Sequence, residues 1–153
     1  MNPRSLMQFR ARQLAAAALA VLISAVAAAP ATAATQGQTP QGWAFVDGGI
    51  GQTETEEMEA DRGKYSLWIM TAGKTSGAHL ADVEVTIADA KGETVFQRRL
   101  EGPWLMIDLP LGRYEVHSRY GEQAQSKVTT IHPGDHHQIV FYFNVDAEVL
   151  PKQ

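Results

Sequence analysis

The chain has 153 residues, with 13 Lys+Arg against 17 Asp+Glu and no cysteine. That length suits one ordinary domain. The lack of cysteine excludes disulfides and thiol nucleophiles. The acidic balance repels phosphate backbones and anionic lipid, so we expect no nucleic-acid partner.

Residues 1–34 have the composition of a signal peptide. Three arginines precede an apolar run over 14–26, and two small-x-small cleavage motifs end at Ala33 and Ala34. The run is shorter than the roughly 20 residues that span a bilayer, although an uncleaved membrane anchor is the alternative. We therefore expect a periplasmic or secreted protein that has no stable membrane insertion after cleavage near Ala33 or Ala34.

Cleavage is expected to leave an N-terminus at Ala34 or Thr35. Without residues 1–34 the balance is 10 Lys+Arg against 17 Asp+Glu, a net charge of −7. N-terminal sequencing of the exported protein checks this prediction. A chain that still begins at Met1 in the membrane fraction would identify an anchor instead.

Residues 35–63 are interpreted as a polar tether, a short strand and an acidic segment. The tether, 35–41, is rich in Gln and Gly, and the apolar run 43–46 suits an edge strand or a flap. We can assign no role to the stretch from Gly48 to Arg62.

The acidic segment predicts a short helix over 53–62. Thr53 suits the N-cap, and Glu56 three residues later completes a capping box. Few of its residues are apolar, so a turn or two is expected, ending at Gly63. The carboxylates favour a solvated stretch, and a weak calcium site is the alternative because EF-hand spacing is missing.

Residues 64–146 alternate apolar and polar positions, with turn signals about every 8–12 residues. The pattern predicts an all-β, seven-stranded Greek-key β-sandwich, followed by a flexible tail over 147–153. The predicted strands are 65–71, 80–89, 93–100, 104–109, 113–120, 122–131 and 138–145.

Two of these strands carry the clearest patterns. Val83, Val85 and Ile87 are expected inward, with Glu84 outward between them. The strand 65–71 is apolar on both faces, as in a central strand.

Two segments carry a resemblance to a known family. They are Leu80-Ala-Asp-Val-Glu-Val-Thr-Ile-Ala-Asp-Ala-Lys-Gly92 and Gly102-Pro-Trp-Leu-Met-Ile-Asp-Leu-Pro-Leu-Gly-Arg-Tyr-Glu-Val116. The chain resembles the carboxypeptidase regulatory-like family, in a small exported bacterial form, over about residues 64–145. The resemblance implies a transthyretin-like (prealbumin-like) fold.

The resemblance implies no peptidase and no catalytic residues. Such domains resemble appendages that support folding, adhesion or contact with partners and glycans. The same fold hosts hydrolases of 5-hydroxyisourate with a C-terminal Tyr-Arg-Gly-Ser signature. This chain ends Val149-Leu-Pro-Lys-Gln153 and lacks that signature, so we expect no enzyme and no cofactor.

Other chemistries are poorly supported by the sequence. No serine lies in a Gly-x-Ser-x-Gly turn, and Gly48-Gly-Ile-Gly51 lacks the Lys-Ser/Thr of a phosphate loop. Trp68 and Trp104 lie in apolar strands and are expected in the core. Tyr142 is out of phase with the apolar residues of its strand, so it is the better candidate for surface contact.

The sharpest chemical signal is the cluster His132, Asp135, His136 and His137. A type II turn over Pro133-Gly134 would place His132 beside Asp135. His136 and His137 are adjacent in a strand, so only one can join them. Three ligands on an exposed hairpin without visible supporting partners favour a solvated turn with no metal, which zinc would not stabilise.

The sequence thus favours an exported, non-enzymatic module that acts through surface contacts with an envelope protein or a glycan. The alternative is a periplasmic metal-handling protein that uses the turn over His132–His137.

Overall fold

The computed structural model describes residues 33–145. The predicted signal peptide, apart from its last two residues, and the predicted tail over 147–153 lie outside the described residues. Within 33–145, no helix combines the length and the apolarity needed to cross a membrane.

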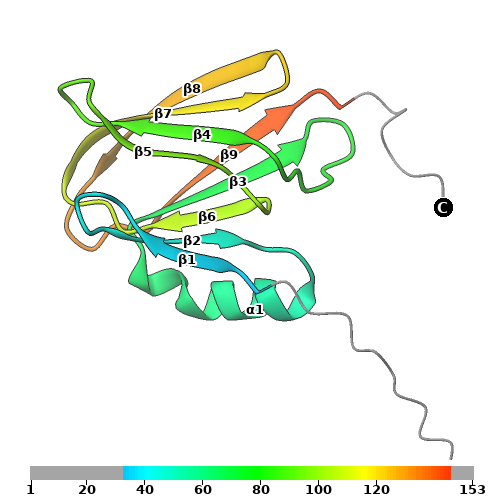
Figure 1. Ribbon diagram of the computed structural model, residues 1–153, viewed down its shortest axis with the longest axis horizontal. Coiled ribbons are helices and arrows are strands. Elements are labelled where there is room, and N and C mark those ends of the chain that lie inside the picture. The colour runs from blue at the N-terminus through cyan, green and yellow to red at the C-terminus, as the bar shows by residue number, and fades with distance from the viewer. Residues whose placement is uncertain (1–32, 146–153) are drawn as a thin grey trace, which may run out of the picture. The chain divides into compact units, whose positions relative to one another are not determined.

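Two β-sheets face each other, and one helix covers the outer face of the larger sheet (Figure 1). Sheet A has the order β1 (Thr35–Gln38), β2 (Ala44–Gly48), β6 (Trp104–Ile107), β3 (Leu67–Gly73), β9 (His137–Phe143). Sheet B has the order β5 (Thr94–Arg99), β4 (Glu84–Ala88), β7 (Gly112–Tyr120), β8 (Gln123–Ile131). The helix α1 spans Gln52–Asp61 and continues into a 3-10 turn, Arg62–Lys64.

The described residues contain nine strands rather than the predicted seven. Of the two additional strands, β2 is the short strand expected near 43–46, here an inner strand rather than an edge strand, and β1 was not predicted; together they extend sheet A beyond β6. β1 lies in the segment interpreted as a tether, and it pairs antiparallel with β2. An edge strand can be held by backbone hydrogen bonds alone. Its polar sequence therefore carries no apolar alternation from which a strand could be predicted.

The inner core lies between the sheets and confirms the predicted alternation. Val83, Val85 and Ile87 are fully buried, as is Val116 in β7, whereas Glu84 is exposed. The inner face of each sheet is therefore the apolar phase of its strands.

A second apolar cluster lies between sheet A and α1. It consists of Val46, Met58, Trp68, Trp104 and Met106. Strands β3 and β6 thus bury both faces, one against sheet B and one under the helix, which explains the apolar composition of 65–71. Trp68 and Trp104 are buried as expected, with their rings edge to face at 4.8 Å between centroids.

The helix differs from its prediction in length and in its cap. It has ten residues, its N-cap is Gly51 rather than Thr53, and the N-cap has no side-chain hydrogen bond. Glu54, not Glu56, reaches back and accepts the N–H of Gly49 at 2.6 Å. The Glu54 carboxylate can be buried there because it accepts hydrogen bonds from backbone N–H groups that precede the first turn of the helix.

The motif Leu109-Pro-Leu-Gly-Arg-Tyr114 is held by a hydrogen bond between its last residue and its second. The hydroxyl of buried Tyr114 donates to the carbonyl of Pro110 at 3.0 Å and ties the strand to the turn before it. Removing this hydroxyl leaves the Pro110 carbonyl without that donor.

Replacing Tyr114 with phenylalanine is expected to lower the free energy of unfolding by about 1 kcal/mol, the usual contribution of one such hydrogen bond. Chemical denaturation measures the change. Tyr142→Phe is the matched control, because that side chain is 51% exposed, and it should leave stability unchanged. Equal effects of the two variants would contradict the role of the hydroxyl.

Candidate functional site

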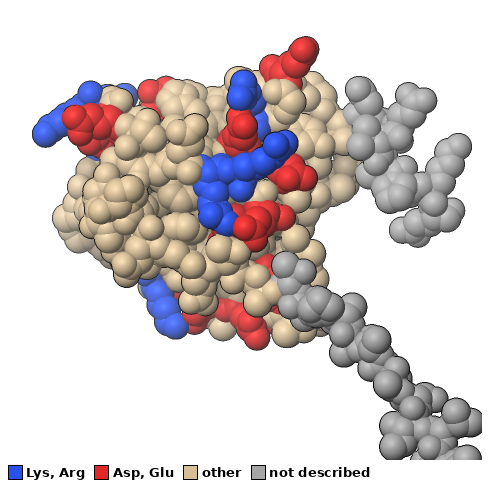
Figure 2. Space-filling model, in the orientation of Figure 1, with Lys and Arg blue, Asp and Glu red and all other residues tan. Residues whose placement is uncertain are grey.

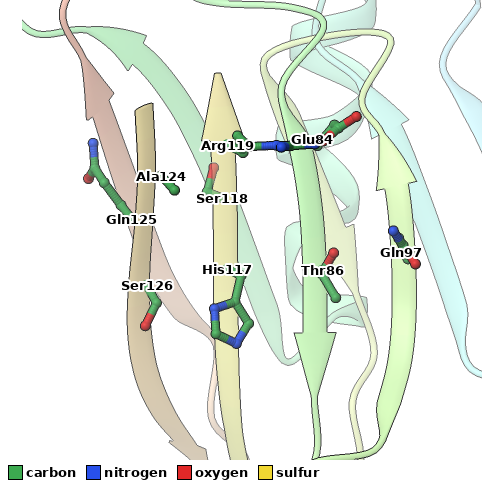
Figure 3. A pocket seen from close by; sticks show the side chains of 9 residues that line it. All are labelled: Glu84, Thr86, Gln97, His117, Ser118, Arg119, Ala124, Gln125 and Ser126. Atoms are coloured by element: carbon green, nitrogen blue, oxygen red, sulfur yellow. Dashed lines mark hydrogen bonds and ion pairs between the residues drawn. The ribbon is translucent and has the colours of Figure 1, made fainter. Parts of the chain in front are cut away.

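The outer face of sheet B is a polar surface that crosses all four strands (Figure 3). Pairing aligns Gln97, Thr86, His117 and Ser126 in one row. The next row contains Arg99, Glu84, Arg119 and Ala124. The surface is hollowed by about 430 Å³. We call it the sheet B surface.

An ion pair organises one end of the sheet B surface. Arg119 reaches across to Glu84, with its Nε and Nη2 donating to Oε2 at 2.9 and 2.6 Å (Figure 3). This hydrogen bond, and then the charge of the guanidinium, lowers the pKa of Glu84 from its ordinary value. On the face seen in Figure 2, acidic and basic side chains likewise lie next to one another.

The middle of the sheet B surface offers hydrogen-bonding groups. The hydroxyl of Ser126 donates to Glu115 at 2.9 Å, and the Nε2 of His117 lies 3.7 Å from the same carboxylate group. Ser126 is thus bonded to a carboxylate rather than to an imidazole.

Tyr142, predicted to be a surface residue, is exposed on β9 and lies outside the sheet B surface. The outer edge of β9 around it is covered by side chains of β8. Gln123, Gln125 and Lys127 donate to the carbonyls of Asn144, Tyr142 and Val140 at 2.6–2.7 Å. This edge of sheet A is therefore closed to pairing with another strand.

The His132–His137 turn folds as a type II turn. The N–H of Asp135 donates to the carbonyl of His132 at 3.1 Å, and Gly134 has φ 78°. The predicted turn over Pro133-Gly134 is therefore confirmed, because a type II turn requires a positive φ at its third position.

The turn brings together His132, Asp135 and His137. Asp135 Oδ2 lies 3.0 Å from His132 Nδ1 and 2.9 Å from His137 Nε2, and it accepts the backbone N–H of His132 at 2.7 Å. That backbone bond, followed by the two imidazoles, lowers the pKa of Asp135 from its ordinary value.

His136 takes no part in this cluster. Its Nδ1 lies 2.8 Å from the carbonyl of Tyr65, so only one of the two adjacent histidines joins Asp135, as predicted. His137 is the one that joins, since it shares the inward phase of Ile139, Phe141 and Phe143 in β9.

A groove of about 400 Å³ adjoins the turn at one end of the sheets. Its walls include the apolar residues Leu109, Pro110, Leu111 and Ile131, and the polar residues His132 and Asp135. Leu111 is 62% exposed.

Sequence reasoning identified the histidine cluster but missed the sheet B surface. The alternation of β4 and β7 predicts which of their residues point outward. It does not predict which strands lie side by side, and so it does not predict which outward residues form one surface. Comparison with protein-family models and with curated proteins finds no match to this chain.

Proposed function

We propose that this chain is an exported, non-enzymatic module that binds a protein of the cell envelope through the sheet B surface. The observation that carries the proposal is the continuous polar face of Gln97, Thr86, His117 and Ser126 beside the Glu84–Arg119 pair. Transient protein interfaces are about as polar as the remaining surface and are enriched in arginine.

Two observations favour a protein partner that lies on this face. The edge of β9 is covered by β8 side chains, which argues against strand addition there. Among the described residues, no Trp, Tyr or Phe lines the sheet B surface, so the apolar side of a sugar ring would find no large flat partner there. A glycan is the other outcome of the test below.

The fold assignment is part of the same proposal. Strands β3–β9 correspond to the seven predicted strands, with β4–β5 and β7–β8 as antiparallel neighbours and β3 parallel to β9. This pairing supports a prealbumin-like Greek-key sandwich to which β1, β2 and α1 are added. The signal-peptide pattern supports export.

Site-specific cross-linking tests the proposal. A photoreactive amino acid at Gln97 is expected to give a discrete protein adduct in cells, whereas the same group at Glu59, exposed on α1, is not. Excess unmodified chain should compete the adduct away. Arg119→Glu should reduce the adduct at least about ten-fold, because the substitution places a second carboxylate beside Glu84.

Equal labelling from Gln97 and Glu59, or an adduct insensitive to Arg119→Glu, would contradict the proposal. Binding of purified envelope polysaccharide that Arg119→Glu abolishes, without any protein adduct, would identify a glycan partner instead.

A further inference from the structure

Three side chains at the β8–β9 turn bring their ligand atoms close together. His132 Nδ1, Asp135 Oδ2 and His137 Nε2 lie within 4.8 Å of one another. In a tetrahedral zinc site with bonds of about 2.0–2.1 Å, ligand atoms lie about 3.3 Å apart. Shifts of a few tenths of an ångström at Asp135, and an approach of up to about 1.5 Å between the two imidazole nitrogens through side-chain rotation, would admit such a cation.

The backbone already fixes the positions of these three residues. The type II turn sets His132 and Asp135 side by side, and the N–H of His132 holds the carboxylate at 2.7 Å. His137 is the first residue of β9, where its N–H donates to Ser66 and its Cα pairs with Leu67 of β3. Binding a cation would therefore order few additional torsions, which lowers its entropic cost.

We propose that His132, Asp135 and His137 bind a divalent transition-metal cation, with Zn²⁺ as the representative ion. Two imidazoles and one carboxylate suit zinc, copper or nickel, whereas calcium and magnesium prefer an all-oxygen shell. This geometry favours the metal-binding alternative that the sequence left open over the solvated turn. The inference is independent of the sheet B surface, which contains none of these residues.

The surroundings of the cluster leave room for a further ligand. Asp135 and His137 have side chains 26% and 41% exposed, and that of His132 is 68% exposed. His132 and Asp135 also line the groove, together with Leu109 and Leu111. The fourth position of the cation is thus available to water or to a donor group of a molecule bound in the groove.

Zinc titration of the purified chain, without a histidine tag, tests the proposal. Calorimetry is expected to show one Zn²⁺ per chain. A free Zn²⁺ concentration of about 100 times the dissociation constant should raise the melting temperature of the chain by about 10 °C. Co²⁺ should give a visible absorption band of a nitrogen- and oxygen-ligated ion, and Ca²⁺ should neither bind nor stabilise.

Single substitutions supply the controls. Loss of an outer-sphere partner alone weakens metal binding about 10–100-fold, so His132→Ala and His137→Ala should each weaken it by at least about 100-fold. His136→Ala is the matched control, because that imidazole contacts Tyr65 instead, and it should retain full affinity. Circular dichroism verifies that each variant is folded.

Three results would overturn the inference. They are failure of zinc to bind the unsubstituted chain, binding that survives both His132→Ala and His137→Ala, and equal losses in His136→Ala and His137→Ala.

Discussion

Replacing Ile87 with aspartate will unfold the domain or leave it marginally stable. Ile87 is fully buried at the centre of sheet B, and its cross-strand neighbours are the apolar Phe96 and Val116. A carboxylate there would have no partner, and burying it costs several kcal/mol in a domain whose total stability is about 5–15 kcal/mol. Chemical denaturation and circular dichroism measure the loss.

Thr86→Asp is the matched control for that substitution. Thr86 is the adjacent residue of β4, but it faces the sheet B surface, between Gln97 and His117. Its replacement should cost no more than about 1 kcal/mol, the spread of strand propensities. Ile87→Val, which removes one methylene, should cost about 1 kcal/mol and keep the fold. Similar losses for the two aspartate variants would mean that the assigned faces of β4 are wrong.

Asp47→Ala is expected to lower the free energy of unfolding by about 3 kcal/mol, within the range for breaking a buried ion pair. Asp47 is fully buried in β2. Its Oδ2 accepts the Nε of Arg98 from β5 at 2.8 Å, and the carboxylate also accepts the N–H groups of Glu101 and Gly102. Alanine would leave the Nε of Arg98 and two backbone donors without this acceptor. Urea unfolding with an unchanged slope would measure the loss directly.

Glu101→Ala is the control, because Glu101 is the second acidic partner of the same arginine. It contacts Arg98 Nη2 at 2.6 Å, but its side chain is 51% exposed. An exposed ion pair contributes about 0–1 kcal/mol. A loss for Glu101→Ala as large as that for Asp47→Ala would show that burial of the pair has no special role in joining the two sheets.

Local patterns in the sequence predicted much of this fold. The period-two alternation around Val85 gave the faces of β4, and the Pro133-Gly134 pair gave the type II turn. Both are local properties, since side-chain alternation follows from the strand backbone and the turn follows from the φ preferences of two residues.

The N-terminal part shows where local patterns fail. β1 has a polar sequence, and among the described residues its only strand partner is β2. The helix was expected to be shorter because few of its residues are apolar, yet Met58 packs on Trp68 and Trp104 in the cluster beneath it. Both outcomes depend on partners that are distant in the sequence, and tertiary packing overrides weak local preference.

The sequence by itself determined the β class, the strand phases and the residue types at the β8–β9 turn. Only the tertiary structure decided that His136 contacts the distant carbonyl of Tyr65, and that residues of β4, β5, β7 and β8 form one polar surface. The physical reason is that the composition of a strand fixes which residues share a face, whereas pairing between distant strands fixes which faces meet.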